Sequence, residues 1–428
     1  MFDPNQKDMY GILWRGMDAF SIYLHVPFCR HRCSYCDFNT FAGQERNIPA
    51  YVDALCREIA VVAAGARVGI MAGPGIEPAR IPVHTVFFGG GTPSLLNAEQ
   101  VTQVLDTLRE QFDIAPDSEI TLEANPGTVT PAWLGAVRRA GANRLSFGMQ
   151  SAHPDDLRLL ERQHDFFDVA QAVRWSREAG FDNLSVDLIF GLPQQSLERW
   201  KETVERAIGL EPDHLSLYAL TIEPGTPLQK RWSHGMIPTV DDDLAADMYE
   251  HTMRRLPEAG FEMYEISNFA RRVNGELRSA RHNLQYWRNL PYLGFGAGAH
   301  GYVPGYAIGR ETGFRTMNAG GIRPFIERSR ADFEGEFPRG PATRRMVPVD
   351  RKTDMQETMM VGLRLVQEGV SAGQFERRFE VALVDVFGKE IDRLTKLDLL
   401  EWVEGDRLRL TPRGVMVGNQ VFINFVGG

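Results

Sequence analysis

Apolar residues follow a repeating pattern along the first 220 residues, in which short continuous runs alternate with longer stretches at helical spacing. A short apolar or β-branched run predicts a buried strand, and a longer periodic stretch predicts an amphipathic helix. Strands are predicted at residues 21–26, 84–88, 119–123, 144–150, 183–189 and 214–220. Helices are predicted at residues 48–64, 97–111, 131–140, 167–179 and 196–209. These repeats predict an α/β fold whose parallel sheet curves into a partial (β/α)6 barrel of the TIM type.

The alternation stops after residues 261–267, and residues 270–275 are predicted to form a loop. Residues 400–410 read as two short strands around a Gly-Asp turn, with helices before them and an amphipathic segment after them, which is the outline of a winged helix. Four regions are therefore predicted: a tail at 1–20, the barrel at 21–270, a connecting region at 271–330 and a smaller C-terminal, winged-helix-like domain at 331–428. Because this last region carries no basic cluster, it is predicted to pack against the barrel rather than to bind DNA.

Bulk composition excludes several classes of protein. The chain has 428 residues, of which 43% are hydrophobic and 24% charged, as in ordinary globular proteins. A formal charge of -9 with no basic cluster argues against a nucleic-acid partner. There is no apolar run long enough for a membrane span, and the first 17 residues mix Asp, Lys and Arg with single hydrophobes, unlike a signal peptide. A cytoplasmic protein is expected.

The cysteines point to a metal centre. Cys29, Cys33 and Cys36 form a C-x3-C-x2-C array directly after the first predicted strand, which is not how a disulfide framework is distributed. Three thiolates can hold three irons of a [4Fe-4S] cluster and leave the fourth iron open to the amino and carboxylate groups of S-adenosylmethionine. A zinc site is less favoured, because structural zinc prefers paired C-x2-C knuckles and no second knuckle exists. Cys56 stands apart in residues 48–64, whose apolar side chains recur at helical spacing, and is predicted to be a buried core thiol.

Polar residues also follow the other predicted strands, where parallel βα folds place their functional groups. The second strand runs into Phe88-Gly-Gly-Gly-Thr-Pro93, whose glycines allow a ligand to approach the backbone closely. Glu123, Gln150 and Asp187 end later strands, and Arg162 follows soon after. A carboxylate here could accept hydrogen bonds from ribose hydroxyls or an ammonium group, and Arg162 could pair with a carboxylate. Structural caps and buried salt bridges explain the same residues equally well.

The C-x3-C-x2-C array after the first strand of a partial barrel resembles the hallmark of the radical S-adenosylmethionine superfamily. Within it, the chain resembles the group of the oxygen-independent coproporphyrinogen III oxidases, which also includes haem chaperones of HemW type. The resemblance runs from about residue 20 to the C-terminus and is carried by residues 22–29, 88–94, 143–151, 159–164 and 186–194. It implies a [4Fe-4S] cluster on Cys29, Cys33 and Cys36. The residues implied to contact S-adenosylmethionine are Tyr23, Tyr35, Gly90, Gly91, Thr92, Glu123, Gln150, Arg162 and Asp187.

Two features separate the chaperones from the enzymes in this group. Phe38 stands two residues after the third cysteine, where the enzymes have a further cysteine, and only about 20 residues precede the first strand, whereas the enzymes have a longer extension. The segment His282-Asn-Leu-Gln-Tyr-Trp287 matches the H-N-x-x-Y-W motif of the chaperones, which is associated with haem binding. A neutral imidazole can ligate haem iron, and Tyr286 and Trp287 offer faces to a porphyrin. His25 and His300 also resemble family positions, but packing roles are favoured for both.

The resemblance therefore implies a haem chaperone that binds haem, an iron-sulfur cluster and S-adenosylmethionine, and that passes haem to acceptor haemoproteins such as respiratory-chain enzymes. It is compatible with a homodimer and with membrane association through the acceptor. The alternative is the coproporphyrinogen dehydrogenase, a radical oxidative decarboxylase of porphyrin biosynthesis, against which Phe38 argues. Radical modification of RNA or protein would need a basic groove or an extra domain that the sequence does not show.

Overall fold

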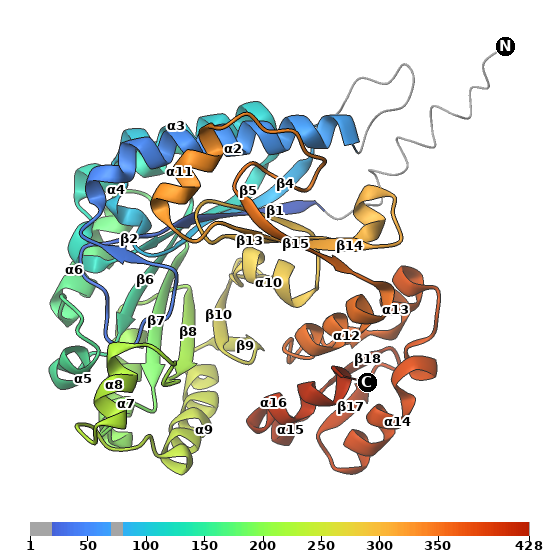
Figure 1. The fold of residues 1–428 in the computed structure, drawn as a ribbon. Coiled ribbons are helices and arrows are strands. Elements are labelled where there is room, and N and C mark those ends of the chain that lie inside the picture. The colour runs from blue at the N-terminus through green and yellow to red at the C-terminus, as the bar shows by residue number, and fades with distance from the viewer. Residues whose placement is uncertain (1–18, 70–79, 428) are drawn as a thin grey trace.

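The structure, a computed structural model, describes residues 19–69 and 80–427, so the predicted tail at 1–20 lies almost wholly outside the described residues (Figure 1). Six parallel strands form a curved sheet in the order β8-β7-β6-β5-β4-β1. They are β1 (Phe20–Val26), β4 (Pro82–Gly90), β5 (Asp113–Ala124), β6 (Arg144–Gln150), β7 (Leu184–Phe190) and β8 (His214–Ala219). The predicted α/β fold with a partial barrel is confirmed.

The helices between these strands cover the outer face of the sheet (Figure 1). They are α2 (Ile48–Gly69), α3 (Ala98–Gln111), α4 (Pro131–Ala140), α5 (Pro154–Leu159), α6 (Phe166–Glu178) and α7 (Leu197–Gly209). Their starts follow from local capping, because Asn97 forms a capping box with Gln100 and the Ser196 hydroxyl accepts from the Arg199 N–H at 3.3 Å. In β1, Ile22 packs in the core under these helices, whereas Tyr23 alternates onto the inner face.

The sheet continues beyond the barrel strands at both edges. Beside β8 lies β10 (Asn268–Val273), which pairs with β9 (Phe261–Glu265) and β11 (Glu276–Leu277). Beside β1 lie β12 (Tyr292–Phe295), β13 (His300–Val303), β14 (Gly313–Asn318) and β15 (Thr343–Val349). The predicted loop at 270–275 is therefore wrong over 270–273, because β10 carries Arg271 and Arg272 and so has no apolar run to identify it.

A smaller second core follows the sheet. It is built from α12 (Arg351–Gly362), β16 (Val370–Ser371), α13 (Ala372–Phe379), α14 (Leu383–Lys396), β17 (Leu400–Val403), β18 (Arg407–Leu410), α15 (Pro412–Met416) and α16 (Gly418–Phe422). The antiparallel strands β16, β18 and β17 beside these helices give the predicted winged-helix-like outline. The main sheet extends to β15, past residue 330, where the sequence predicts the second domain to begin.

The remaining α-helices of the described chain are α8 (Pro227–Ser233), α9 (Asp242–Glu258), α10 (Arg281–Trp287) and α11 (Ile322–Arg330). Figure 1 shows α10 between the curved sheet and the C-terminal helices. Among the residues that the structure describes, no helix combines the length and apolar character needed to cross a membrane.

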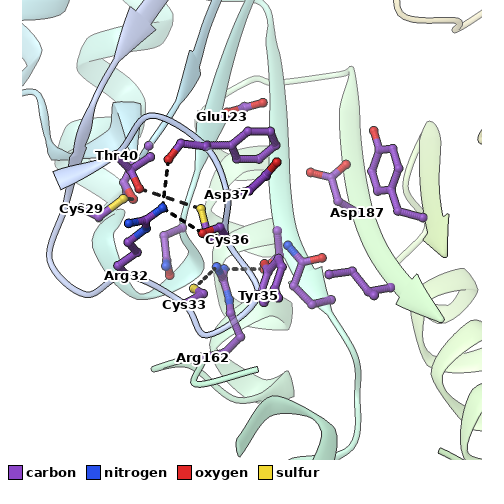
Figure 2. Close-up of a pocket in the computed structure, with 18 of the residues that line it drawn as sticks. Cys29, Arg32, Cys33, Tyr35, Cys36, Asp37, Thr40, Glu123, Arg162 and Asp187 are labelled. Carbon is purple, nitrogen blue, oxygen red and sulfur yellow. Dashed lines mark hydrogen bonds between the residues drawn. The ribbon is translucent and has the colours of Figure 1, made fainter. Parts of the chain in front are cut away.

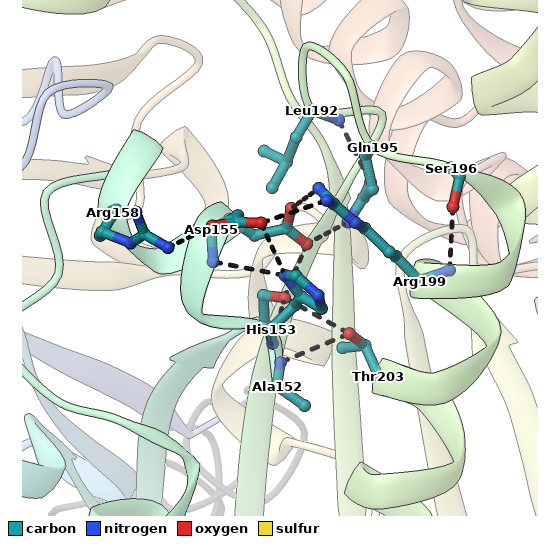
Figure 3. Close-up of polar contacts among 11 residues, drawn as sticks. Ala152, His153, Asp155, Arg158, Leu192, Gln195, Ser196, Arg199 and Thr203 are labelled. Atoms are coloured by element: carbon teal, nitrogen blue, oxygen red, sulfur yellow. Dashed lines mark hydrogen bonds and ion pairs between the residues drawn. The ribbon is translucent and has the colours of Figure 1, made fainter.

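A buried polar cluster fixes the segment after β6, which carries Arg162. The buried Asp156 carboxylate accepts from the Ser151 hydroxyl at 2.8 Å and from the Gln195 amide at 3.1 Å. Arg199 of α7 lies 3.6 Å from the same carboxylate, and Figure 3 shows it reaching across from its helix. Because buried polar networks with satisfied partners are rigid, this cluster holds α5 against the start of α7 and fixes the loop that presents Arg162.

Candidate functional site

A cavity of about 470 Å³ opens at the carboxyl ends of the barrel strands (Figure 2). Of the residues expected to hold the cluster or S-adenosylmethionine, eleven line it: Cys29, Cys33, Tyr35, Cys36, Gly90, Gly91, Thr92, Glu123, Gln150, Arg162 and Asp187. Tyr23 does not line it, because its hydroxyl lies 2.9 Å from His25 Nδ1 and its ring stacks on Phe87 within the barrel. These eleven residues therefore gather in space although they come from six different strands and loops.

The three cysteines lie on one loop that is bracketed by short pairing between β2 (Phe28–Cys29) and β3 (Phe41–Ala42). All three are free thiols. The Thr92 hydroxyl lies 3.6 Å from Cys29 Sγ, and the Arg162 guanidinium donates to Cys33 Sγ at 3.4 Å. Burial raises the pKa of the Cys29 and Cys36 thiols, so iron must displace their protons.

The three thiols share one cavity, as a cluster on three cysteines requires. Within residues 19–69 and 80–427, no three His, Cys, Asp or Glu side chains are grouped closely enough to hold a single metal ion. In a [4Fe-4S] cluster each thiolate binds a different iron, so thiols spread around one cavity meet the requirement. The side chains of Cys29, Cys33 and Cys36 all line the same cavity.

Residues that the sequence did not single out hold the cysteine loop in shape. Arg32 donates to the Cys36 carbonyl at 3.1 Å. The Asn39 amide donates to the Ala297 carbonyl at 2.9 Å, and the Asn39 carbonyl lies 2.9 Å from Nε2 of the buried His25. The packing role predicted for His25 is thus confirmed, whereas the one predicted for His300 is wrong, because His300 is exposed at the start of β13.

The glycine loop after β4 lies directly against the cysteine loop. The Gly91 N–H donates to the Val26 carbonyl at 2.9 Å. A Cβ atom on Gly91 would lie 2.7 Å from that carbonyl oxygen and 2.6 Å from the carbonyl oxygen of Phe28. Gly90 has a φ of +107°, which other residues rarely adopt, and a Cβ atom there would lie 2.4 Å from Cε1 of the His25 ring. Only glycine therefore allows the two loops to meet at this distance.

Two carboxylates face the cavity from β5 and β7. Glu123 accepts from the Gly90 N–H at 3.0 Å, and Asp187 accepts from the Ser146 hydroxyl at 3.0 Å. Burial, with a further contribution from the Asp187 charge, raises the pKa of Glu123 to about 8. Burial also raises the pKa of Asp187. A buried acidic pair of this kind favours a cationic ligand, because a nearby positive charge stabilises both carboxylates.

Arg162 supplies the opposite charge across the cavity (Figure 2). One of its terminal nitrogens donates to the Gly148 carbonyl at 2.8 Å, and the other contacts Cys33. Its Nε is buried and has no acceptor among the described residues. Thiols, an acidic pair and an arginine with an unsatisfied donor fit a zwitterionic ligand that carries an additional positive charge, as S-adenosylmethionine does.

Tyr218 is a lining residue that sequence reasoning missed. It is the last but one residue of β8, lines the cavity and is 45% exposed. The strand-end rule that identified Glu123 and Asp187 also applied to this sixth strand, so its signal was present. Ser146, which orients Asp187, carried no such signal, because a serine within a strand is unremarkable on its own.

The segment 282–287 lies in α10 near the amino ends of the barrel strands, away from the cysteine loop. His282 is 1% exposed, and its Nδ1 lies 2.7 Å from the Thr85 hydroxyl. Its Nε2 lies 2.8 Å from the Tyr286 hydroxyl, and its ring stacks on Phe87. Burial lowers the pKa of His282 to about 3, so the imidazole is neutral. Ligation of haem iron by His282 would require Thr85 or Tyr286 to release it.

The structure does not bring all three predicted haem residues together. His282 and Tyr286 are in contact inside the barrel, but Trp287 lines a separate cavity toward the C-terminal domain. Cys56 also differs from expectation, because it is only partly buried on α2 rather than enclosed in the core.

Comparison with known proteins shows similarity along nearly the whole chain. Residues 23–207 match the Radical SAM superfamily, and residues 349–417 match the HemN C-terminal domain. The chain is 35% identical over 408 residues to heme chaperone HemW of Bacillus subtilis, covering 95% of this chain and 99% of that protein. It is 32% identical to heme chaperone HemW of Lactococcus lactis, and the match covers 95% of this chain and 97% of that protein.

The chain is also similar to a eukaryotic protein and to a solved structure. The chain is 37% identical over 393 residues to the bovine (Bos taurus) mitochondrial radical S-adenosyl methionine domain-containing protein 1, covering 90% of this chain and 82% of that protein. Among solved structures, coproporphyrinogen III oxidase (HemN) of Escherichia coli superposes with a TM-score of 0.77 at 23% identity, covering 98% of this chain and 93% of that one. At that identity the likeness establishes a shared fold.

Proposed function

This chain belongs to the HemW family of radical SAM proteins, and on that premise we propose that it is a haem chaperone. It binds haem, carries a [4Fe-4S] cluster with S-adenosylmethionine, and transfers haem to acceptor haemoproteins, with respiratory-chain enzymes as the expected class. The observation that carries the proposal is the match over 95% of this chain and 99% of the Bacillus subtilis protein named heme chaperone HemW.

Phe38 supports a chaperone over a coproporphyrinogen dehydrogenase. Its side chain is 62% exposed and lines the cavity next to the cysteine loop. The enzymes of this group are expected to carry a cysteine at that position, and an exposed phenyl ring cannot replace a thiol as a metal ligand or a hydrogen donor. The proposal therefore does not include conversion of coproporphyrinogen.

Different residues around the cavity are suited to hold the cluster and the separate parts of S-adenosylmethionine. Cys29, Cys33 and Cys36 would hold the cluster, whose chemistry is the supply of single electrons. Backbone groups of the glycine loop would hold the methionine part of S-adenosylmethionine, Glu123 and Asp187 would pair with its positive charges or accept from its ribose hydroxyls, and Arg162 would pair with its carboxylate.

Binding of S-adenosylmethionine is expected to strengthen about tenfold between about pH 6.5 and about pH 8.5. Because the pKa of Glu123 is about 8, this side chain is mostly protonated at the lower pH and is a carboxylate at the higher pH. The carboxylate attracts the sulfonium cation and the protonated acid does not, so affinity rises as pH rises. Isothermal titration of the reconstituted protein at both pH values measures the change. Glu123→Gln should bind with a weaker pH dependence, and an unchanged dependence in this variant would contradict the assignment.

The function itself is tested by transfer. Haem-loaded protein is mixed with membrane vesicles whose respiratory haemoproteins have been depleted of haem, and separately with apomyoglobin, which only scavenges haem that dissociates. We expect transfer to the vesicles to be faster than loss to apomyoglobin, because a chaperone hands its cargo over in a complex. Equal rates would mean passive release and would contradict the proposal.

A further inference from the structure

An exposed histidine, His300, lies on the part of the sheet that extends past β1 and β12. It starts β13, and its partner in the register is Met317 of β14, which in turn pairs with Arg345 of β15. Directly opposed residues of neighbouring antiparallel strands place their side chains on the same face of a sheet. The three side chains therefore form a line across β13, β14 and β15, which we call the β13–β15 row. Figure 1 shows these strands continuing the barrel sheet toward the C-terminal domain.

Contacts two residues further along the same strands show which face of the sheet carries the row. Tyr302 donates to Asp354 of α12 at 2.6 Å, and Arg315 donates to Glu357 of the same helix at 2.6 Å. Alternate residues of a strand point to one face, so the β13–β15 row also lies on the inner face, toward the C-terminal domain. Helix α12 contacts the neighbouring residues, but both ends of the row are exposed.

Each member of the β13–β15 row suits a different part of haem. The imidazole of His300 has no hydrogen-bond partner among the described residues, and burial together with the charge of Arg315 lowers its pKa. A neutral imidazole with a free nitrogen can ligate haem iron. Met317 is half-buried and offers a flexible apolar side chain. Arg345 is exposed and forms no ion pair within residues 19–69 and 80–427, so its guanidinium is available to a propionate.

The spacing of the row matches these parts of haem. Neighbouring strands lie about 4.8 Å apart, so Arg345 lies about 10 Å from His300, across two strands. In haem the iron lies at the centre of a planar ring and the propionates project from its edge, so one molecule lying along the row reaches both residues. On β12, next to His300, stands Gly294, where a side chain would collide with the His300 backbone. No β12 side chain therefore covers the imidazole at this position.

The row lies beside the cysteine loop. The Asn39 amide of that loop donates to the carbonyls of Ala297, just before β13, and Gly320, just after β14, at 2.9 Å and 2.8 Å. His25 also contacts the loop, and it is close enough to His300 for the charge of His300 to lower its pKa. A ligand on the row would therefore lie close to the loop that is expected to hold the cluster.

We infer that this protein holds haem on the inner face of β13, β14 and β15, with His300 bound to the iron, Met317 against the porphyrin and Arg345 paired with a propionate. The inference rests on the proposed function, since it locates the cargo that the function requires. It gives a role to an imidazole that the fold leaves exposed and without a hydrogen bond. It differs from ligation by His282, whose two ring nitrogens both lie within hydrogen-bond distance of partners inside the barrel.

Resonance Raman spectroscopy of the ferrous, haem-loaded protein tests the iron ligand. The wild type should show the iron–histidine stretching band, and His300→Ala should lose it, because no imidazole then reaches the iron. Imidazole added to His300→Ala should restore a nitrogen ligand, which a purely structural role for His300 would not allow. His234→Ala, at an exposed histidine just after α8, is the matched control and should keep the band.

Titration of haem into the protein, followed by its Soret absorbance, tests the row as a whole. His300→Ala is expected to weaken haem binding about tenfold and Arg345→Glu about fivefold, through loss of the bond to iron and reversal of charge. Arg330→Glu, at the exposed last residue of α11, should bind haem like the wild type. All of these substituted residues are exposed, so the variants should fold, and thermal unfolding checks that they do.

The outcomes separate the two proposals. If the wild type binds no haem, the proposed function fails. If it binds haem without an iron–histidine band, or if His300→Ala keeps the band, the function stands and the β13–β15 row is wrong. His282→Ala is expected to keep the band, and loss of the band in this variant alone would place the iron at α10 instead.

Discussion

Cys33→Ala is expected to abolish assembly of the [4Fe-4S] cluster. Cys33 is one of three thiols that line the cavity, and it is the one contacted by the Arg162 guanidinium. A [4Fe-4S] cluster held by three thiolates already has one iron without a protein ligand. Removal of Cys33 would leave a second iron without one, and two thiolates would not anchor the cluster. After anaerobic reconstitution, iron and acid-labile sulfide should fall to the level of unreconstituted protein, and the cluster's visible absorbance should disappear.

Cys56→Ala is the matched control, because Cys56 is the remaining cysteine and lies on α2, outside the cavity. It should assemble a full cluster. The ligand assignment would be overturned if the Cys33 variant kept its full iron content, or if loss of Cys56 removed the cluster.

Gly91→Ala is expected to weaken binding of S-adenosylmethionine about a hundredfold. A Cβ atom at this position would lie 2.6 Å and 2.7 Å from two backbone carbonyl oxygens, of Phe28 and Val26. Neither oxygen belongs to a flexible side chain, so the glycine loop must move away from the cysteine loop. That movement would displace Thr92 and the backbone groups that line the cavity and would hold the ligand. Equilibrium dialysis with radiolabelled S-adenosylmethionine measures the loss.

Gly127→Ala provides the comparison, since Gly127 lies in the neighbouring loop after β5 and a Cβ atom there meets only Asn125 Oδ1, at 3.8 Å. It should bind S-adenosylmethionine normally. If the Gly91 variant bound as tightly as the wild type, the close approach of the two loops would have no part in the site.

The parts of the fold that the sequence predicts are those with strong local signals. Buried parallel strands appear as apolar runs, and helices such as α3 and α7 begin at capping residues, so the barrel follows from pattern alone. The strands added at the edges of the sheet cannot be predicted from the pattern. β15, for example, is exposed along most of its length and carries two arginines, so no apolar run marks it.

The functional site was likewise predictable from the sequence only in part. The cavity residues were predictable because strand ends meet at one edge of a parallel sheet. The sequence also predicts that Trp287 lies apart from His282 and Tyr286. Residues four apart lie on one face of a helix, and the residue after them lies on another. His282 and Tyr286 therefore face the barrel together, whereas Trp287 faces elsewhere. What spacing cannot tell is which end of the barrel receives α10, because long-range contacts such as the 2.7 Å contact from His282 to Thr85 decide that.

Haem, rather than a porphyrinogen, is the tetrapyrrole that we propose this protein handles. The most direct measurement offers the anaerobically reconstituted protein haem in one sample, and coproporphyrinogen III with S-adenosylmethionine and a reductant in another. Stoichiometric binding of haem, with no decarboxylated product in the second sample, is the predicted result. Conversion of coproporphyrinogen to protoporphyrinogen would contradict the account and would show that Phe38 does not exclude the enzyme.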